Sequence, residues 1–228
     1  MITFIKEGHR YVYNETGKEL QPSTDFIAEF FEKFDTERWS RHIALRDGMS
    51  VQAVLDMWEK KKNDSCDFGT NVHSYAESLI RKTDPPEPRT KAEEIYFNAV
   101  DRFFETEDHE FIEAEKIIGS PAYGLAGQID AVSKTDKGIW LVDWKTNKSI
   151  DVHAYMGKKA LKPIDHLEDC NFSKYSLQLS LYRYMLEKEM KVAGLLLVHL
   201  LPNGRYEKYK VDYLRKEVER MLAFTGRL

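Results

Sequence analysis

Hydrophobic positions in the first half of the chain recur mostly with the period of an α-helix. Residues 90–105 show this best, and Thr90 can cap that helix. Its apolar positions are Ala92, Ile95, Tyr96, Ala99, Val100 and Phe103. Further helices are predicted at residues 23–34, 36–47, 50–62 and 69–81, the first capped by Ser23 or Thr24. Residues 1–20 are rich in aromatic and β-branched positions around a turn at 14–17, which predicts a hairpin.

The period changes after residue 106 to the alternation of β-strands. Three short segments separated by turn residues predict a meander of antiparallel strands at residues 110–118, 125–134 and 138–145. A helix is predicted at 174–188, followed by strands at 193–200 and 205–211 and a helix from 212. This order predicts an α/β (α+β) protein in which a mixed central sheet is flanked by helices, with a helical N-terminal region.

Length and composition narrow the class of protein. A chain of 228 residues favours a single domain, which we divide into the hairpin and helical region at 1–90 and the core at 91–228. No apolar run approaches the ~20 residues of a membrane helix, and the N-terminus lacks a secretory pattern, so we expect a cytoplasmic protein. The only cysteines are Cys66 and Cys170, too few for a four-cysteine zinc site or iron–sulfur cluster. The net charge of −4 leaves room for local basic patches that bind nucleic acid.

Candidate chemistry lies at the end of the predicted strand 138–145. Asp143 and Lys145 are two residues apart, so both side chains point to one face, and Asp130 on the preceding strand can reach the same place. Two carboxylates suit Mg²⁺ or Mn²⁺, and an ammonium can orient the attacking water in phosphodiester hydrolysis. An acid-x-Lys triplet also occurs at residues 59–61 and 189–191, where a helical pattern indicates surface charge.

Two helical pairs have the four-residue spacing that places side chains on one face. His73 and Glu77 form the first pair, which taken alone is more typical of a surface than of a site. Gln178 and Tyr182 form the second, and the Gln178 amide needs a polar partner if it is buried.

Together these motifs resemble the RecB-like branch of the PD-(D/E)XK nuclease superfamily, including its phage and mitochondrial exonucleases. The matching stretches, in order, are Gly69 to His73, Gly127 to Asp130, Asp143 to Thr146, and Gln178 to Tyr182. The resemblance implies metal ligands at His73, Asp130, Asp143 and the Trp144 carbonyl, with Asp130, Asp143 and Lys145 catalytic. It implies nucleic-acid contacts at Gln178 and Tyr182. Beside such a site Glu77 becomes a supporting carboxylate, and Glu115 can add another, although a glutamate on a strand face is more often a surface residue.

The function expected from the resemblance is that of a Mg²⁺- or Mn²⁺-dependent DNA exonuclease without an iron–sulfur cluster. Its substrate would be single-stranded DNA or DNA ends, in repair or recombination, in a bacterial cell and encoded by the bacterium or a phage. Residues 145–162 are locally basic, and Lys158 and Lys159 are candidate DNA contacts, although a solvated loop explains them nearly as well. Three alternatives stay open: a restriction-type endonuclease, a module that binds nucleic acid without cleaving it, and a hydrolase of another phosphate compound.

Overall fold

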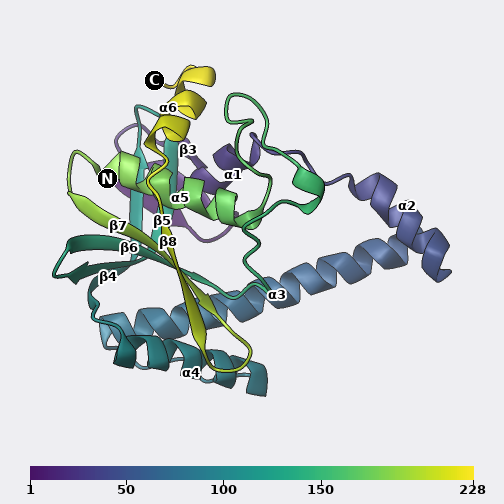
Figure 1. Cartoon of the computed structure of the whole chain (residues 1–228), viewed down its shortest axis with the longest axis horizontal. Helices are drawn as coiled ribbons and strands as arrows, with labels where there is room; N and C mark the ends of the chain where they lie inside the picture. The colour runs from purple at the N-terminus through teal and green to yellow at the C-terminus, as the bar shows by residue number, and fades with distance from the viewer.

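The computed structural model describes residues 1–228, and its centre is an eight-stranded mixed sheet (Figure 1). Seven strands follow the order β1-β2-β3-β5-β6-β7-β8, and β4 pairs with β5. The β3–β5 and β6–β7 pairs are parallel and the others antiparallel. The strands are β1 (Ile2–Ile5), β2 (Arg10–Tyr13), β3 (Lys18–Pro22), β4 (Glu110–Ser120), β5 (Leu125–Thr135), β6 (Gly138–Lys145), β7 (Val192–Leu200) and β8 (Tyr206–Val211). The predicted mixed sheet and its β4–β5–β6 meander are confirmed.

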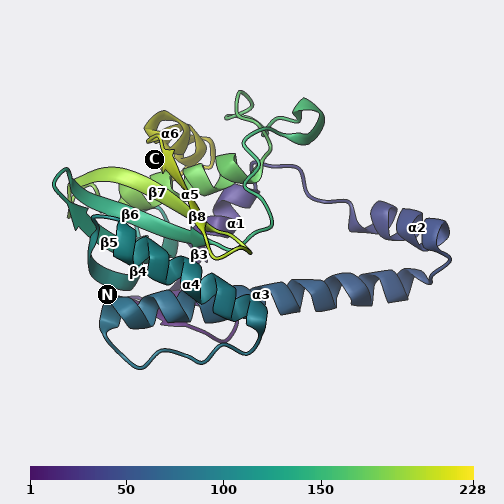
Figure 2. The same cartoon turned by 60° about the horizontal axis from the view of Figure 1, so that its bottom comes forward.

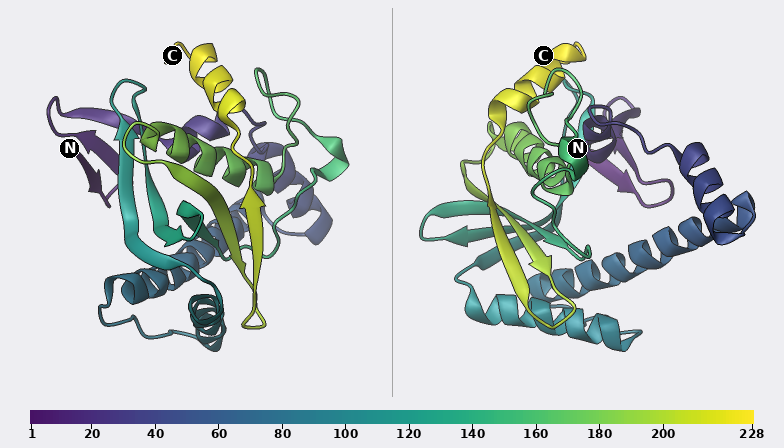
Figure 3. Two further views of the ribbon diagram at one scale, coloured as in Figure 1. Left: turned by 60° about the vertical axis from the view of Figure 1, so that its left-hand side comes forward. Right: turned by 45° about the vertical axis from the view of Figure 1, so that its right-hand side comes forward.

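Helices cover both faces of this sheet. They are α1 (Ser23–Ala28), α2 (Thr36–Asp47), α3 (Val51–Arg81), α4 (Lys91–Thr106), α5 (Asn171–Leu186) and α6 (Arg215–Phe224), with a short 3₁₀ turn, η1 (Tyr155–Gly157). One face of the sheet packs on α3 and α4, and the other face packs on α5. Helices α1 and α6 pack with α5 in a further apolar cluster. The N-terminal strands lie against β4 and β5 (Figure 3).

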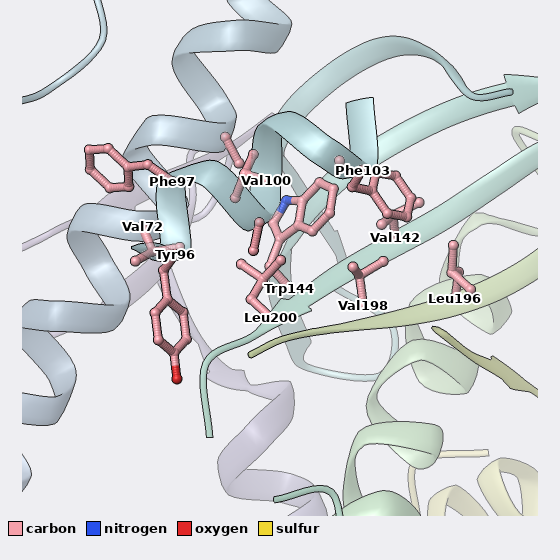
Figure 4. Packing of buried hydrophobic residues seen from close by; sticks show 13 residues of the cluster. Val72, Tyr96, Phe97, Val100, Phe103, Val142, Trp144, Leu196, Val198 and Leu200 are labelled. Atoms are coloured by element: carbon pink, nitrogen blue, oxygen red, sulfur yellow. The ribbon is translucent and has the colours of Figure 1, made fainter. Parts of the chain in front are cut away.

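Trp144 is the centre of the core beneath α3 and α4 (Figure 4). Its side chain is 1% exposed and packs edge-to-face on Phe103, with ring centres 5.2 Å apart. Val142 lies in the same cluster, whereas Leu141 packs in the cluster beneath α5. This alternation along β6 is the predicted one. Val142 and Trp144 anchor one face of the strand end in the core, and Asp143 and Lys145 point to the other face.

The helix α3 differs from the prediction. Residues 50–62 and 69–81 were expected to form two helices, but one helix of 31 residues spans both segments. Asn63, Asp64 and Ser65 favour turns in isolation, yet residues 51–68 contain neither glycine nor proline and the helix continues through them. The outer half of α3 extends beyond the sheet with α2 beside it (Figure 2). Despite the length of α3, no helix in the protein combines the length and apolarity needed to cross a membrane.

The N-terminal region also differs in detail. The expected hairpin has a third strand, β3, which joins it to β5 through parallel pairs at Gln21 and Pro22. Helix α1 ends at Ala28 instead of residue 34, and no side chain caps it. The Ser23 hydroxyl, which was expected to cap α1, donates instead to the carbonyl of Ala126 at 2.8 Å. This bond fastens the start of α1 to the strand that carries Asp130.

Candidate active site

The strands β5 and β6 separate at the point where the candidate acids lie. Their ladder ends at the pair Ala131–Val142, one residue before Asp130 and Asp143. Beyond it, the Trp144 N–H donates to Oδ2 of Asp130 at 2.8 Å, so a side chain replaces the missing backbone partner. Because the buried Trp144 ring fixes this N–H, the core fixes the Asp130 carboxylate as well.

His73 reaches Asp130 from the inner half of α3. Val72 and Ala76 are fully buried and hold this part of the helix against the sheet. Nδ1 of His73 lies 3.4 Å from Oδ2 of Asp130. Gly69 lies one turn earlier, where a Cβ would lie 3.4 Å from Oγ1 of Thr146, the residue that follows Lys145. The helix with the Gly-x-x-x-His motif and the strand with the Asp-x-Lys motif thus meet at one place.

Glu115 lies on β4 in the left-handed region, with φ +52°. Its neighbours Ala114 and Lys116 pair with Ala131 and Ile129, which flank Asp130 on β5. Irregular backbone in a strand can redirect a side chain near a functional site. One ligand atom each from His73, Glu115 and Asp130 lies within 4.8 Å of the others. Glu115, expected only to support the ligands, is therefore itself within reach of a shared ion.

Asp143 and Lys145 form a buried pair beside this cluster. Nζ of Lys145 lies 2.6 Å from Oδ2 of Asp143 and 4.3 Å from the centre of the Tyr175 ring on α5. Apart from this ammonium, Oδ2 of Asp143 has no partner. The charges of Asp130 and His73 also act on Asp143. A carboxylate beside a second carboxylate and an imidazole fits a divalent ion such as Mg²⁺ or Mn²⁺.

Burial and neighbouring charges shift the pKa values of the site residues. Burial acts to lower the pKa of His73, but the Asp130 carboxylate outweighs it and raises the pKa to about 9. Burial acts to raise the pKa of Asp130, but His73 holds it below its usual value. Burial raises the pKa of Glu115 to about 8 and that of Asp143 to about 6. Burial opposes the charge of Lys145, yet Asp143 and Asp130 raise its pKa, so the side chain is an ammonium.

The second helical pair lies on the opposite side of the site. Gln178 is half-buried, and its amide donates to the Tyr182 hydroxyl at 3.0 Å, a polar partner of the kind expected for a buried amide. Tyr182 is 3% exposed, so its ring belongs to the core beneath α5. Glu77 pairs with Arg81 at 2.7 Å and lies one turn along α3 from His73.

Two hollows meet at the site. The first, of about 800 Å³, is the catalytic cavity, which is lined by His73, Glu115, Asp130, Glu77, Gln178 and Tyr182 among others. The second, of about 780 Å³, is the lysine cleft, which is lined by Lys60, Lys61, Lys148, Phe68 and Thr146 among others. Both hollows include Ser65 and Cys66 of α3. The two hollows therefore adjoin at these two residues.

The two lysines predicted as DNA contacts, Lys158 and Lys159, lie elsewhere. Lys158 pairs with Glu32 at 3.0 Å and Lys159 with Glu168 at 3.7 Å, and neither lines the two hollows. Lys60 and Lys61, which the sequence pattern assigned to a charged helical surface, line the lysine cleft. Their position depends on the unbroken course of α3, for which the sequence carried no clear signal.

A comparison with protein families identifies the class of protein to which the chain belongs. Residues 99–225, more than half of the chain, match the family described as the PD-(D/E)XK nuclease superfamily. The chain belongs to this superfamily, and its members are metal-dependent nucleases that act on nucleic acid. A solved structure described as "Crystal structure of SSO0001" is 14% identical, with 90% of this chain and 74% of that chain covered and a TM-score of 0.34. A comparison with curated proteins finds no match.

Proposed function

We propose that the protein is an Mg²⁺- or Mn²⁺-dependent exodeoxyribonuclease of the RecB-like branch, acting on single-stranded DNA or on DNA ends. The observation that carries the proposal is the cluster of His73, Glu115 and Asp130 on the wall of the catalytic cavity, with the Asp143–Lys145 pair beside it. A hollow of about 800 Å³ is of the size that holds drug-sized ligands. It suits a few unpaired nucleotides better than a duplex. The choice of DNA and of the RecB-like branch rests on the four ordered motifs.

Each residue of the site has its own role in the proposed hydrolysis. Asp130, Asp143, His73 and Glu115 would hold one or two ions, and the Trp144 carbonyl is a further candidate ligand. A bound ion supplies a water of lowered pKa and charge stabilisation at the phosphate. Lys145 is protonated, so it cannot take a proton; it orients the attacking water as a donor and offsets charge on the phosphate. The Tyr175 ring, 4.3 Å from Nζ, limits the positions of this ammonium.

We also propose that residues 1–228 act as one nuclease unit. His73 from α3, Glu115 from β4 and the N-terminal strands all border the catalytic cavity, so the region before residue 91 supplies part of the site. Gln178 would contact the strand near the cluster, and Tyr182, through its hydroxyl, would hold the Gln178 amide in place.

One assay separates this function from its alternatives. End-labelled linear DNA, circular DNA and RNA, single- and double-stranded, are incubated with Mg²⁺, Mn²⁺ or EDTA, and Asp143→Asn serves as the control. We expect metal-dependent cleavage of linear single strands and none of circular DNA. Cleavage of the circle would establish an endonuclease instead. Binding without cleavage under every metal condition would identify a non-cleaving module.

A further inference from the structure

Three aromatic rings gather on the hairpin of β1 and β2 at the mouth of the catalytic cavity. The ring centres of Phe4 and His9 lie 4.9 Å apart, those of Phe4 and Tyr11 5.0 Å, and those of His9 and Tyr11 5.6 Å. All three residues line the same cavity as His73 and Asp130. Tyr11 is buried, Phe4 is half-buried and His9 is exposed. The cluster is therefore anchored at its base and open at its outer ring.

The backbone holds His9 in this place. The connection between the strands turns through Gly8 at φ +75° and His9 at φ +50°, and the His9 N–H donates to the Lys6 carbonyl at 3.1 Å. A non-glycine residue at positive φ is uncommon and directs attention to what its side chain does. Here the imidazole lies edge-on against both Phe4 and Tyr11.

The surroundings join this cluster to the catalytic residues. Tyr11 packs with Leu20 and Ala126, and Ala126 lies four residues before Asp130 on β5. Burial and the nearby charge of Glu115 raise the pKa of Tyr11 to about 12, so its hydroxyl is neutral beside that acid. Lys6 on the hairpin also lines the cavity, whereas Arg81 at the end of α3 is paired with Glu77. An aromatic face beside a cation suits a single strand, because every base has a π-face and every linkage a phosphate.

We propose that the β1–β2 hairpin forms a nucleotide subsite, in which one unpaired base of the DNA strand stacks on the exposed ring of His9, which Phe4 supports edge-on, while Lys6 contacts an adjoining phosphate. This inference rests on the proposed function and adds to it a base-binding position outside the metal cluster. Stacking on an aromatic surface is tolerant of sequence, so the subsite favours unpaired strands over duplexes without selecting a base.

Binding is measured in EDTA, so that no cleavage occurs, with a short single-stranded oligonucleotide carrying the fluorescent base 2-aminopurine at successive positions. We expect one position to be quenched in the parent and not in His9→Ala. Loss of one stacked base weakens binding by about 5- to 150-fold. His9→Phe, which keeps a ring, should restore most of the affinity, and Lys6→Gln should lower the salt dependence.

Tyr13→Ala is the matched control, because Tyr13 is an aromatic residue of the same hairpin that lies outside the catalytic cavity. Unchanged affinity and quenching in His9→Ala and Phe4→Ala, with a parent that binds and cleaves single strands, would overturn the subsite and leave the nuclease intact. An equal loss in Tyr13→Ala would also overturn it, since the hairpin would then act only through its fold. Failure of the parent to cleave any nucleic acid with Mg²⁺ or Mn²⁺ would instead overturn the proposed function.

Discussion

A Cβ atom on Gly127 would lie 2.5 Å from Cε1 of Tyr182, closer than two such atoms can approach. The glycine of the Gly-x-x-Asp motif and the tyrosine of the Gln-x-x-x-Tyr motif are therefore two sides of one contact, between β5 and α5. This contact sets how near Gln178 comes to the strand of Asp130. Two motifs far apart in the sequence thus describe a single steric requirement.

Gly127→Ala should therefore destabilise the protein and displace Tyr182. Overpacking of a core contact costs about 1–3 kcal/mol, which thermal unfolding can measure, and we expect nuclease activity to fall with it. Tyr182→Leu removes the ring that the methyl group meets. The double variant should be less destabilised than the sum of the two single variants, and simple additivity would show that the two sites do not interact.

Asp143→Asn and Lys145→Ala should each lower cleavage by roughly 10²-fold or more, the scale expected when a group that stabilises developing charge is lost. The melting temperature of Asp143→Asn should stay near that of the parent, because the substitution removes one of two neighbouring carboxylates and leaves Asp130 to balance the charge of Lys145. Asp136→Asn and Lys137→Ala, in the exposed β5–β6 turn, are the matched controls. Full activity in either site variant would refute the assignment.

Metal binding should release protons. The pKa of His73 is raised to about 9 and that of Glu115 to about 8, so at pH 7 both side chains carry a proton that a metal ion must displace. Affinity for Mn²⁺ should therefore weaken as the pH falls below about 9, with about tenfold per pH unit for each proton displaced.

Calorimetric titration of Mn²⁺ in buffers of different ionisation enthalpy counts these protons. His73→Gln should bind Mn²⁺ more weakly and release about one proton fewer. His166→Gln is the control, because His166 lies outside both hollows. Equal proton release in the parent and His73→Gln would remove His73 from the ligand set.

Substitution of two separate groups of lysines distinguishes two paths for the DNA strand. Replacing Lys60, Lys61 and Lys148 with Gln should weaken single-strand binding and reduce the log–log salt slope by about two units if all three contact phosphates. The same change at Lys158, Lys159 and Lys162 should have a smaller effect, since Lys158 and Lys159 already pair with acids and none of the three lines either hollow. A larger loss from the second group would place the strand along residues 158–162.

The spacing of apolar and polar residues was enough to predict strands β4 to β6 of the sheet and the alternation around Trp144. These three strands are consecutive in the chain, and the two faces of β6 pack in two different core clusters. The arrangement around Glu115 could not be predicted, since its position depends on a left-handed backbone within a strand. The course of α3 was also missed: two helices were expected, but residues 51–68 contain neither glycine nor proline and the helix is continuous. The position of Lys60 and Lys61 in the lysine cleft was missed for the same reason.

The helix α3 divides into two halves of unequal stability. Between Val54 and Val72 it has no buried residue, whereas its last ten residues include Val72, Ala76 and Ser78, all buried. Few buried contacts mean a low free energy of local opening. The outer turns should therefore exchange their amide hydrogens early and be the first place a protease cuts. The amide hydrogens of the turn that carries His73 should exchange as slowly as those of the core. The protein can then lose the order of its projecting arm and keep His73 in place beside Asp130.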